Sequence, residues 1–103
     1  MNKTIFLIAT SEVQDDVVVT DAQYATTLIA AQREASYFMR ESVGDYLDIP
    51  VDDIDGRNCA VEKRVSIETS MFCNLYTEKR IYRCDGLTVS ATIQEANLSA
   101  THG

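Results

Sequence analysis

The sequence contains little of what enzyme and metal sites are commonly built from. It has one histidine, His102, and its three cysteines, Cys59, Cys73 and Cys84, form no Cys-x-x-Cys pair. A histidine base, a Cys–His nucleophile or a zinc site would have to use that single histidine. We therefore expect no catalytic residues, no metal and no cofactor, and we expect the thiols to be free and passive.

Long hydrophobic runs are also missing. The longest run of apolar residues covers positions 5–9. It is shorter than the apolar region of a signal peptide and far below the ~20 residues that a membrane span requires. We expect a cytoplasmic protein that makes no membrane contact and keeps its cysteines reduced.

Positive charge is scarce, with nine Lys and Arg against sixteen Asp and Glu, for a net charge of −7. Residues 1–56 carry eleven acids and three bases, hence −8, whereas residues 57–103 carry five acids and six bases, hence +1. Nucleic acids and anionic lipids both require a basic footprint on the protein. Both are therefore disfavoured as direct ligands.

The remaining composition is that of an ordinary globular domain. Hydrophobic residues make up 46% of the 103 positions, and charged residues make up 24%. A chain of this length can bury one core without disulfides. We expect a single domain over residues 1–96, followed by a flexible, small and polar tail over residues 97–103.

The clearest periodic segment is a predicted helix over residues 20–47. Thr20 and Gln23 have the spacing of a capping box. Gly44 offers a helix stop, the helix could also run one turn further, and Pro50 ends it in either case. The apolar stripe, interrupted by Gln32, consists of Ala25, Leu28, Ile29, Ala35, Met39, Val43 and Tyr46. Such a stripe must lie on a sheet.

The rest of the sequence predicts strands. Residues 3–10 and 17–19 precede the helix, and strict alternation begins near residue 60, with the odd-numbered residues facing the core. Asp85-Gly86 is a hairpin signal that pairs Cys84 with Leu87 and continues that register. These elements predict an α+β domain, one long helix packed on a curled antiparallel sheet of four to five strands. Cystatin-like and ferredoxin-like arrangements are both compatible with this order.

An acidic run is the strongest candidate for a functional surface. It has no lysine or arginine between Arg40 and Arg57 and comprises Glu41, Asp45, Asp48, Asp52, Asp53 and Asp55. On a helix, like charges three or four residues apart cost roughly 0.2–0.5 kcal/mol per pair, and the C-terminal dipole also disfavours anions. The competing interpretation is that arginines and lysines of the sheet pair with the run, or that it is merely a solvated face.

Residues 51–62 also resemble the spacing of a calcium loop. Asp53, Asp55, Gly56 and Glu62 fall at positions three, five, six and twelve of such a loop. Its first position is Val51, where a carboxylate is required, and Asn58 stands where an aliphatic residue normally packs. We expect a solvated turn rather than a calcium site.

A second candidate surface is the outer sheet face. The alternation places Phe72 and Tyr76 there together with Ile81, and Arg64 and Arg83 lie beside them. Aromatic side chains flanked by arginines are typical of modules that stack single-stranded RNA. The same patch could instead form a homodimer contact.

We therefore expect a non-enzymatic binding or inhibitor protein. Its acidic helix end and the following loop would dock on the basic surface of a nucleic-acid-binding partner, in the manner of the nucleic-acid mimics carried by phages and mobile elements. The alternative is a homodimeric scaffold or single-stranded nucleic-acid binder that uses the outer sheet face.

Overall fold

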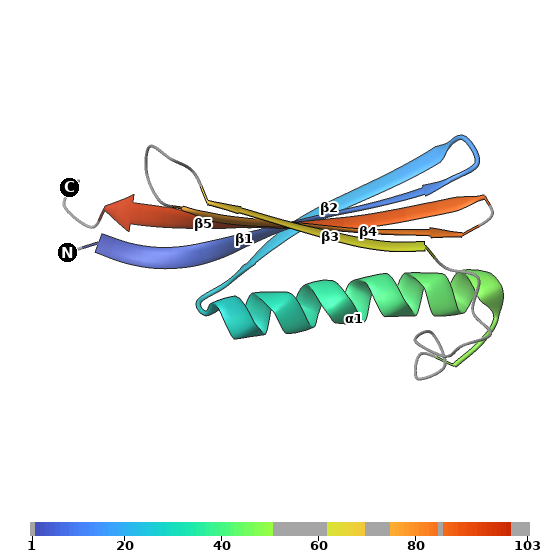
Figure 1. Cartoon of the computed structure of the whole chain (residues 1–103), viewed down its shortest axis with the longest axis horizontal. Helices are drawn as coiled ribbons and strands as arrows, with labels where there is room; N and C mark the ends of the chain where they lie inside the picture. The colour runs from blue at the N-terminus through green and yellow to red at the C-terminus, as the bar shows by residue number, and fades with distance from the viewer. Residues whose placement is uncertain (1, 51–61, 70–74, 85, 100–103) are drawn as a thin grey trace.

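The chain folds as one helix packed on a five-stranded antiparallel sheet, as Figure 1 shows. The structure is a computed structural model that describes residues 2–50, 62–69, 75–84 and 86–99. The strand order is β2-β1-β5-β4-β3, so β2 and β3 are the two edges. The elements are β1 (Asn2–Gln14), β2 (Val17–Ala25), α1 (Leu28–Leu47), β3 (Glu62–Thr69), β4 (Tyr76–Cys84) and β5 (Leu87–Ser99). The predicted α+β class is confirmed. The order β-β-α-β-β-β differs from the ferredoxin-like order.

The N-terminal hairpin is longer than the sequence predicted. A turn at Asp15, whose φ of 53° is left-handed, reverses the chain, and β2 pairs with β1 from Val17 to Ala25. The predicted helix start at Thr20 is wrong, because that stretch is strand. The N-cap is Thr27, whose side chain accepts a hydrogen bond from the Ala30 N–H at 3.1 Å. Pairing along nine residues outweighs one local capping box.

The helix ends at Leu47, one turn beyond the candidate stop at Gly44. Asp48 follows in the left-handed conformation, with φ 57°, and its N–H donates to the Gly44 carbonyl, as does the Ile49 N–H. Ala31, Ala35, Met39 and Val43 of α1 are completely buried. Ile29 was predicted in this stripe but is 63% exposed, because it lies on the solvent side of the first turn.

The core lies between α1 and the middle of the sheet. Ile8 of β1 and Val89, Ala91 and Ile93 of β5 meet the buried stripe of the helix. The predicted β4–β5 hairpin is confirmed residue by residue, since Cys84 pairs with Leu87 and the same register runs on to Thr77 and Gln94. This local hairpin supplies the central strand of the sheet.

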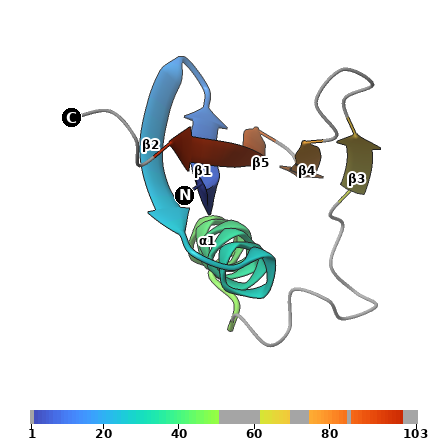
Figure 2. The same cartoon turned by 90° about the vertical axis from the view of Figure 1, so that its left-hand side faces the viewer.

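The edge strand β3 lies beyond the reach of the helix. Five strands about 4.8 Å apart make a sheet wider than one helix of ~10 Å diameter. Among the described elements α1 contacts β5, β1, β2 and β4. Figure 2 shows β3 to one side of it. Val65 and Ile67 lie on the sheet face that carries the core, as predicted, but they are exposed and are not part of that core.

The C-terminal strand reaches further than expected. β5 continues to Ser99, and its last residues pair with the start of β1, where the Thr4 hydroxyl donates to Asn97 Oδ1 at 3.0 Å. Residues 97–99 therefore belong to the sheet and not to a tail. Within the described part of the chain, no helix is long and apolar enough to cross a membrane.

Candidate protein-binding surface

A groove runs between α1 and the first two strands, and carboxylates dominate its lining. We call it the acidic groove; its side chains are Glu12, Gln23, Glu34, Tyr37, Phe38, Glu41, Ser42 and Asp45. Its volume of about 280 Å³ is slightly below the range typical of small-molecule pockets. The groove is therefore better suited to side chains of a macromolecule than to an enclosed ligand.

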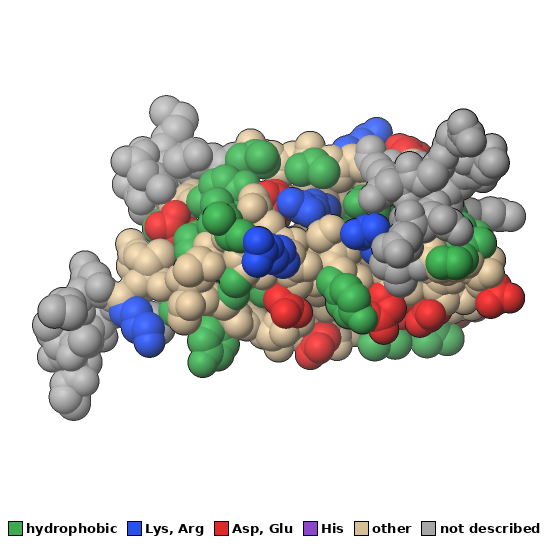
Figure 3. Space-filling view, turned by 90° about the horizontal axis from the view of Figure 1, so that it is seen from below, with side chains coloured by type: hydrophobic (Ala, Val, Ile, Leu, Met, Phe, Trp, Pro, Cys, Tyr) green, Lys and Arg blue, Asp and Glu red, His purple; other side chains and the backbone are tan. Residues whose placement is uncertain are grey.

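The helical period explains why these acids share one flank. Glu34, Glu41 and Asp45 are seven and four residues apart, so they stand one above the other along α1. Gln32 lies on the opposite flank, where its side chain reaches β4. Figure 3, which looks onto the helix side, shows acidic side chains lined up along one side of the molecule. The fold adds Glu12 of β1 to this row.

The pKa of Tyr37 shows the effect of the carboxylates around it. A hydrogen bond to the Glu41 carboxylate, followed by the negative charge of the same group, raises the pKa of Tyr37, and the charges of Asp45 and Glu34 act in the same direction. The ring is 62% exposed. An aromatic face surrounded by carboxylates can hold a lysine or arginine side chain by charge and by cation–π attraction.

No described basic side chain of the sheet forms an ion pair with the acids of the groove. The Arg80 guanidinium pairs with Glu78, and Arg64 pairs with Glu62 at 3.5 Å. Among the described residues, no ion pair involves Glu41, Asp45 or Asp48. Intramolecular pairing of these three acids, which the sequence left open, is therefore not seen there.

The structure places the other predicted acids as follows. Asp48 is exposed and follows the last turn of α1 outside the groove lining. Asp52, Asp53 and Asp55, with the calcium-loop segment, lie outside the described residues. Glu34 was not predicted because it precedes Arg40 and so lies outside the acidic run, although its spacing of seven residues to Glu41 places both on one flank of the helix. Glu12 depends on the fold and had no local signal.

Glu78 is the one acid whose carboxylate is held inside the protein among the described residues. It is 1% exposed and accepts hydrogen bonds from Gln32 Nε2 at 2.9 Å, from the Tyr76 hydroxyl at 2.7 Å and from Arg80 Nε. Burial by itself would raise the pKa of Glu78, but these three donors outweigh it and the pKa is lowered. The network fastens α1 to β4, so we assign it a structural role.

The described residues of the predicted sheet-face platform do not all lie on one face of the sheet. Arg64 and Arg83 do lie together with Ile81, around a small hollow on the face opposite the helix. Tyr76 points to the helix side, where it reaches Glu78. Phe72 lies outside the described residues. Of the described members of the predicted stacking surface, Arg64, Arg83 and Ile81 share the open face and Tyr76 does not.

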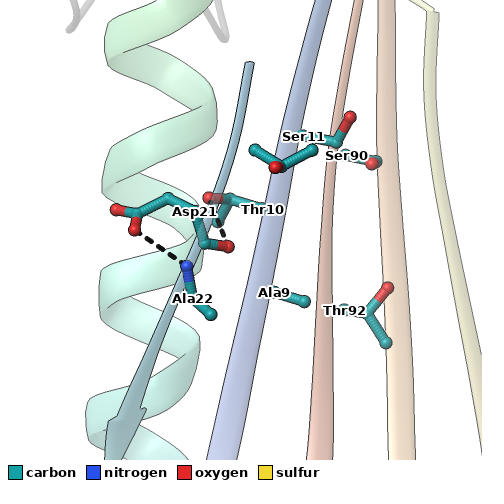
Figure 4. A pocket seen from close by; sticks show the side chains of 8 residues that line it. Ala9, Thr10, Ser11, Asp21, Ala22, Ser90 and Thr92 are labelled. Atoms are coloured by element: carbon teal, nitrogen blue, oxygen red, sulfur yellow. Dashed lines mark hydrogen bonds between the residues drawn. The ribbon is translucent and has the colours of Figure 1, made fainter. Parts of the chain in front are cut away.

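A broad shallow depression occupies the centre of the same open face, and Figure 4 shows it from close by. Small side chains from three neighbouring strands form it, among them Ala9, Ser11, Ser90 and Thr92. At its border the Thr10 hydroxyl donates to the Asp21 carbonyl, and the Ala22 N–H donates to the Asp21 carboxylate at 2.8 Å. These groups indicate no particular ligand.

Comparison with protein-family models, curated proteins and solved structures finds no match for the chain. Within the described residues, no group of three or more His, Cys, Asp or Glu is arranged to hold a metal ion.

Proposed function

We propose that this chain is a non-enzymatic binding or inhibitor protein that docks its acidic groove and helix end on a basic surface of a nucleic-acid-binding protein or complex. The observation that carries the proposal is that Glu12, Glu34, Glu41 and Asp45 share one groove and that none of them has a cationic partner within the described residues. Exposed like charges of this kind cost stability, so folding alone does not explain them.

The row of acids imitates a nucleic-acid backbone in the sign of its charge and in its straight course, at a lower charge density. Glu34 and Asp45 are eleven residues apart and hence roughly 16 Å apart along the helix axis. Duplex DNA presents one phosphate charge per ~1.7 Å of axis, and single strands are about half as dense. The groove acids form an anionic row along α1 that can compete for a DNA or RNA channel. The sequence adds the negative charges of Asp48, Asp52, Asp53 and Asp55 after it. The analogy of this row with phage and mobile-element inhibitors is one of charge and size.

Affinity capture from the native host tests this proposal. The wild-type chain, a Glu41→Gln/Asp45→Asn variant and an Asp15→Asn/Asp16→Asn variant serve as baits at low salt. The two variants lose the same charge, but the second loses it in the β1–β2 turn, where asparagine tolerates the left-handed conformation of Asp15. We expect the wild type and the turn variant to retain a basic nucleic-acid-binding protein and the groove variant to lose it. A salt step should release that protein from the two baits that retain it. Equal retention by all three baits would contradict the proposal.

A second candidate function uses the open sheet face, for a homodimer or for single-stranded nucleic acid. The observation in its favour is that Arg64 and Arg83 lie side by side there. An Arg64→Glu/Arg83→Glu variant separates the two functions. It should abolish oligonucleotide binding or dimerisation if the sheet face is used, and it should leave capture by the acidic groove intact.

A further inference from the structure

The outer edge of β2 carries little of the protection usual for an edge strand, namely the single charge of Asp21. Among the described strands β2 pairs only with β1, so its other side has no strand neighbour. Natural edge strands commonly carry lysine, proline or a bulge that prevents further pairing. Residues 17–25 contain no basic residue and no proline, and Val17, Val18 and Val19 are 55–62% exposed. The opposite edge, β3, is instead rich in charge of both signs.

This edge borders the acidic groove. Gln23 of β2 lines the groove, and Val19 is paired with Glu12, which lines it as well. Side chains alternate between the two faces of a sheet. A strand added beside β2 would therefore direct every second side chain to the helix side, next to the groove, and the others to the open face beside Val18 and Tyr24. Figure 2 shows β2 as the outermost strand on this side.

We propose that the partner binds β2 as a sixth strand, through an extended segment with lysine or arginine at every second position. This inference rests on the proposed function and specifies the form in which the basic partner meets the groove. Main-chain hydrogen bonds to β2 hold the segment, and the acids of the groove select its alternate basic side chains. The intervening positions are apolar, because they lie beside Val18 and the exposed ring of Tyr24.

Charge decides against a second copy of this chain as the occupant. Asp21 is the single charged residue of β2 and stands at its centre, so an antiparallel pair of β2 strands would bring two carboxylates and two acidic grooves together. The Asp21 carboxylate also occupies the Ala22 N–H, which withdraws one backbone donor of β2. That donor is lost to any added strand, whereas the negative charge of Asp21 repels an acidic strand and attracts a basic one.

The test uses three synthetic peptides that match the nine residues of β2 in length. The parent peptide alternates lysine and valine. Two further peptides have the same sequence, and the backbone is N-methylated at the lysines in one and at the valines in the other. All three carry the same charge. In a strand, the N–H groups of alternate residues point to opposite edges, so each methylated peptide lacks the donors of one edge. Dissociation constants are measured with the full chain by fluorescence anisotropy at low salt, and amide hydrogen exchange compares residues 17–25 with residues 62–69 of β3.

We expect the parent to bind, at least one methylated peptide to lose tenfold or more in affinity, and the parent to slow exchange in β2 but not in β3. Binding of both methylated peptides within twofold of the parent, with loss on Glu41→Gln/Asp45→Asn, would overturn strand addition while leaving the proposed function standing. Protection of β3 instead of β2 would also overturn it. Absence of binding by all three peptides would overturn strand addition, and the lysate capture would then decide the proposed function separately.

Discussion

Two groups of carboxylates in this molecule have opposite surroundings. Glu78 is buried and receives hydrogen bonds from Gln32, Tyr76 and Arg80. Glu41 and Asp45, on the other flank of the same helix, are solvent-accessible and have no cationic partner among the described residues. The acid that lies inside the fold, Glu78, is thus provided with hydrogen-bond donors. The contrast supports the proposal that the groove acids meet an external partner.

The largest effect is expected from removing the buried acid. Glu78→Ala leaves Arg80, whose side chain is 20% exposed, without its carboxylate. The Gln32 and Tyr76 side chains also lose the acceptor of their hydrogen bonds. We expect a loss of about 3–5 kcal/mol in the free energy of unfolding. Urea denaturation measures it. A loss below about 1 kcal/mol would mean that the network does not hold α1 to β4.

The pH dependence of stability should distinguish the same residue. Because the pKa of Glu78 is lowered in the folded protein, its ionised form stabilises the fold above the unfolded value near 4.5, and that stability is lost as pH falls through the folded pKa. We expect Glu78→Gln to be less stable than wild type at pH 7 and the difference to shrink below pH 4.5. Melting curves from pH 7 to pH 3 would show it, and a constant difference would contradict the assignment.

The two sides of the helix provide the next comparison. Met39→Ala should cost about 2–5 kcal/mol, because Met39 is completely buried against the sheet. Ile29→Ala serves as its control and should cost less than about 0.5 kcal/mol, because Ile29 is exposed. Similar losses at the two positions would show that the buried face of α1 is misassigned.

The sequence predicts most of the architecture where local signals and pairing agree. The Asp85-Gly86 turn defines the β4–β5 register, and the spacing of Ala35, Met39 and Val43 defines the buried stripe. Prediction failed where a local signal competed with a distant one. Thr20 has the side chain of an N-cap, which a local pattern can indicate. Its pairing with β1 depends on a residue on the other side of the hairpin, which a local pattern does not indicate. Part of the groove could be predicted, because the helix period places Glu41 and Asp45 on one flank. Glu12 could not be predicted, because only the order of strands in the sheet brings it to that flank.

A smaller effect should mark the true start of the helix. Thr27→Ala removes the hydroxyl that accepts the Ala30 N–H and should cost about 0.5–2 kcal/mol. Thr20→Ala removes the N-cap that the sequence suggested and should change the unfolding free energy by less than Thr27→Ala, because Thr20 lies exposed in β2. Thermal unfolding of both variants compares them, and the reverse order would place the helix start at Thr20.

A small change in stability should accompany the largest change in binding. Asp45 lies one turn after Glu41 in the last turns of α1, where no basic residue offsets the helix dipole. Asp45→Lys relieves the repulsion, allows a pair with Glu41 and should stabilise the fold by about 0.5–1 kcal/mol. Association with the captured partner should become slower and lose much of its salt dependence, because charges steer encounter over a Debye length of ~8 Å. Stopped-flow association at two salt concentrations and thermal unfolding of the same variant measure both. A destabilised variant that associates normally would show that Asp45 serves the fold and that the groove is not the docking surface.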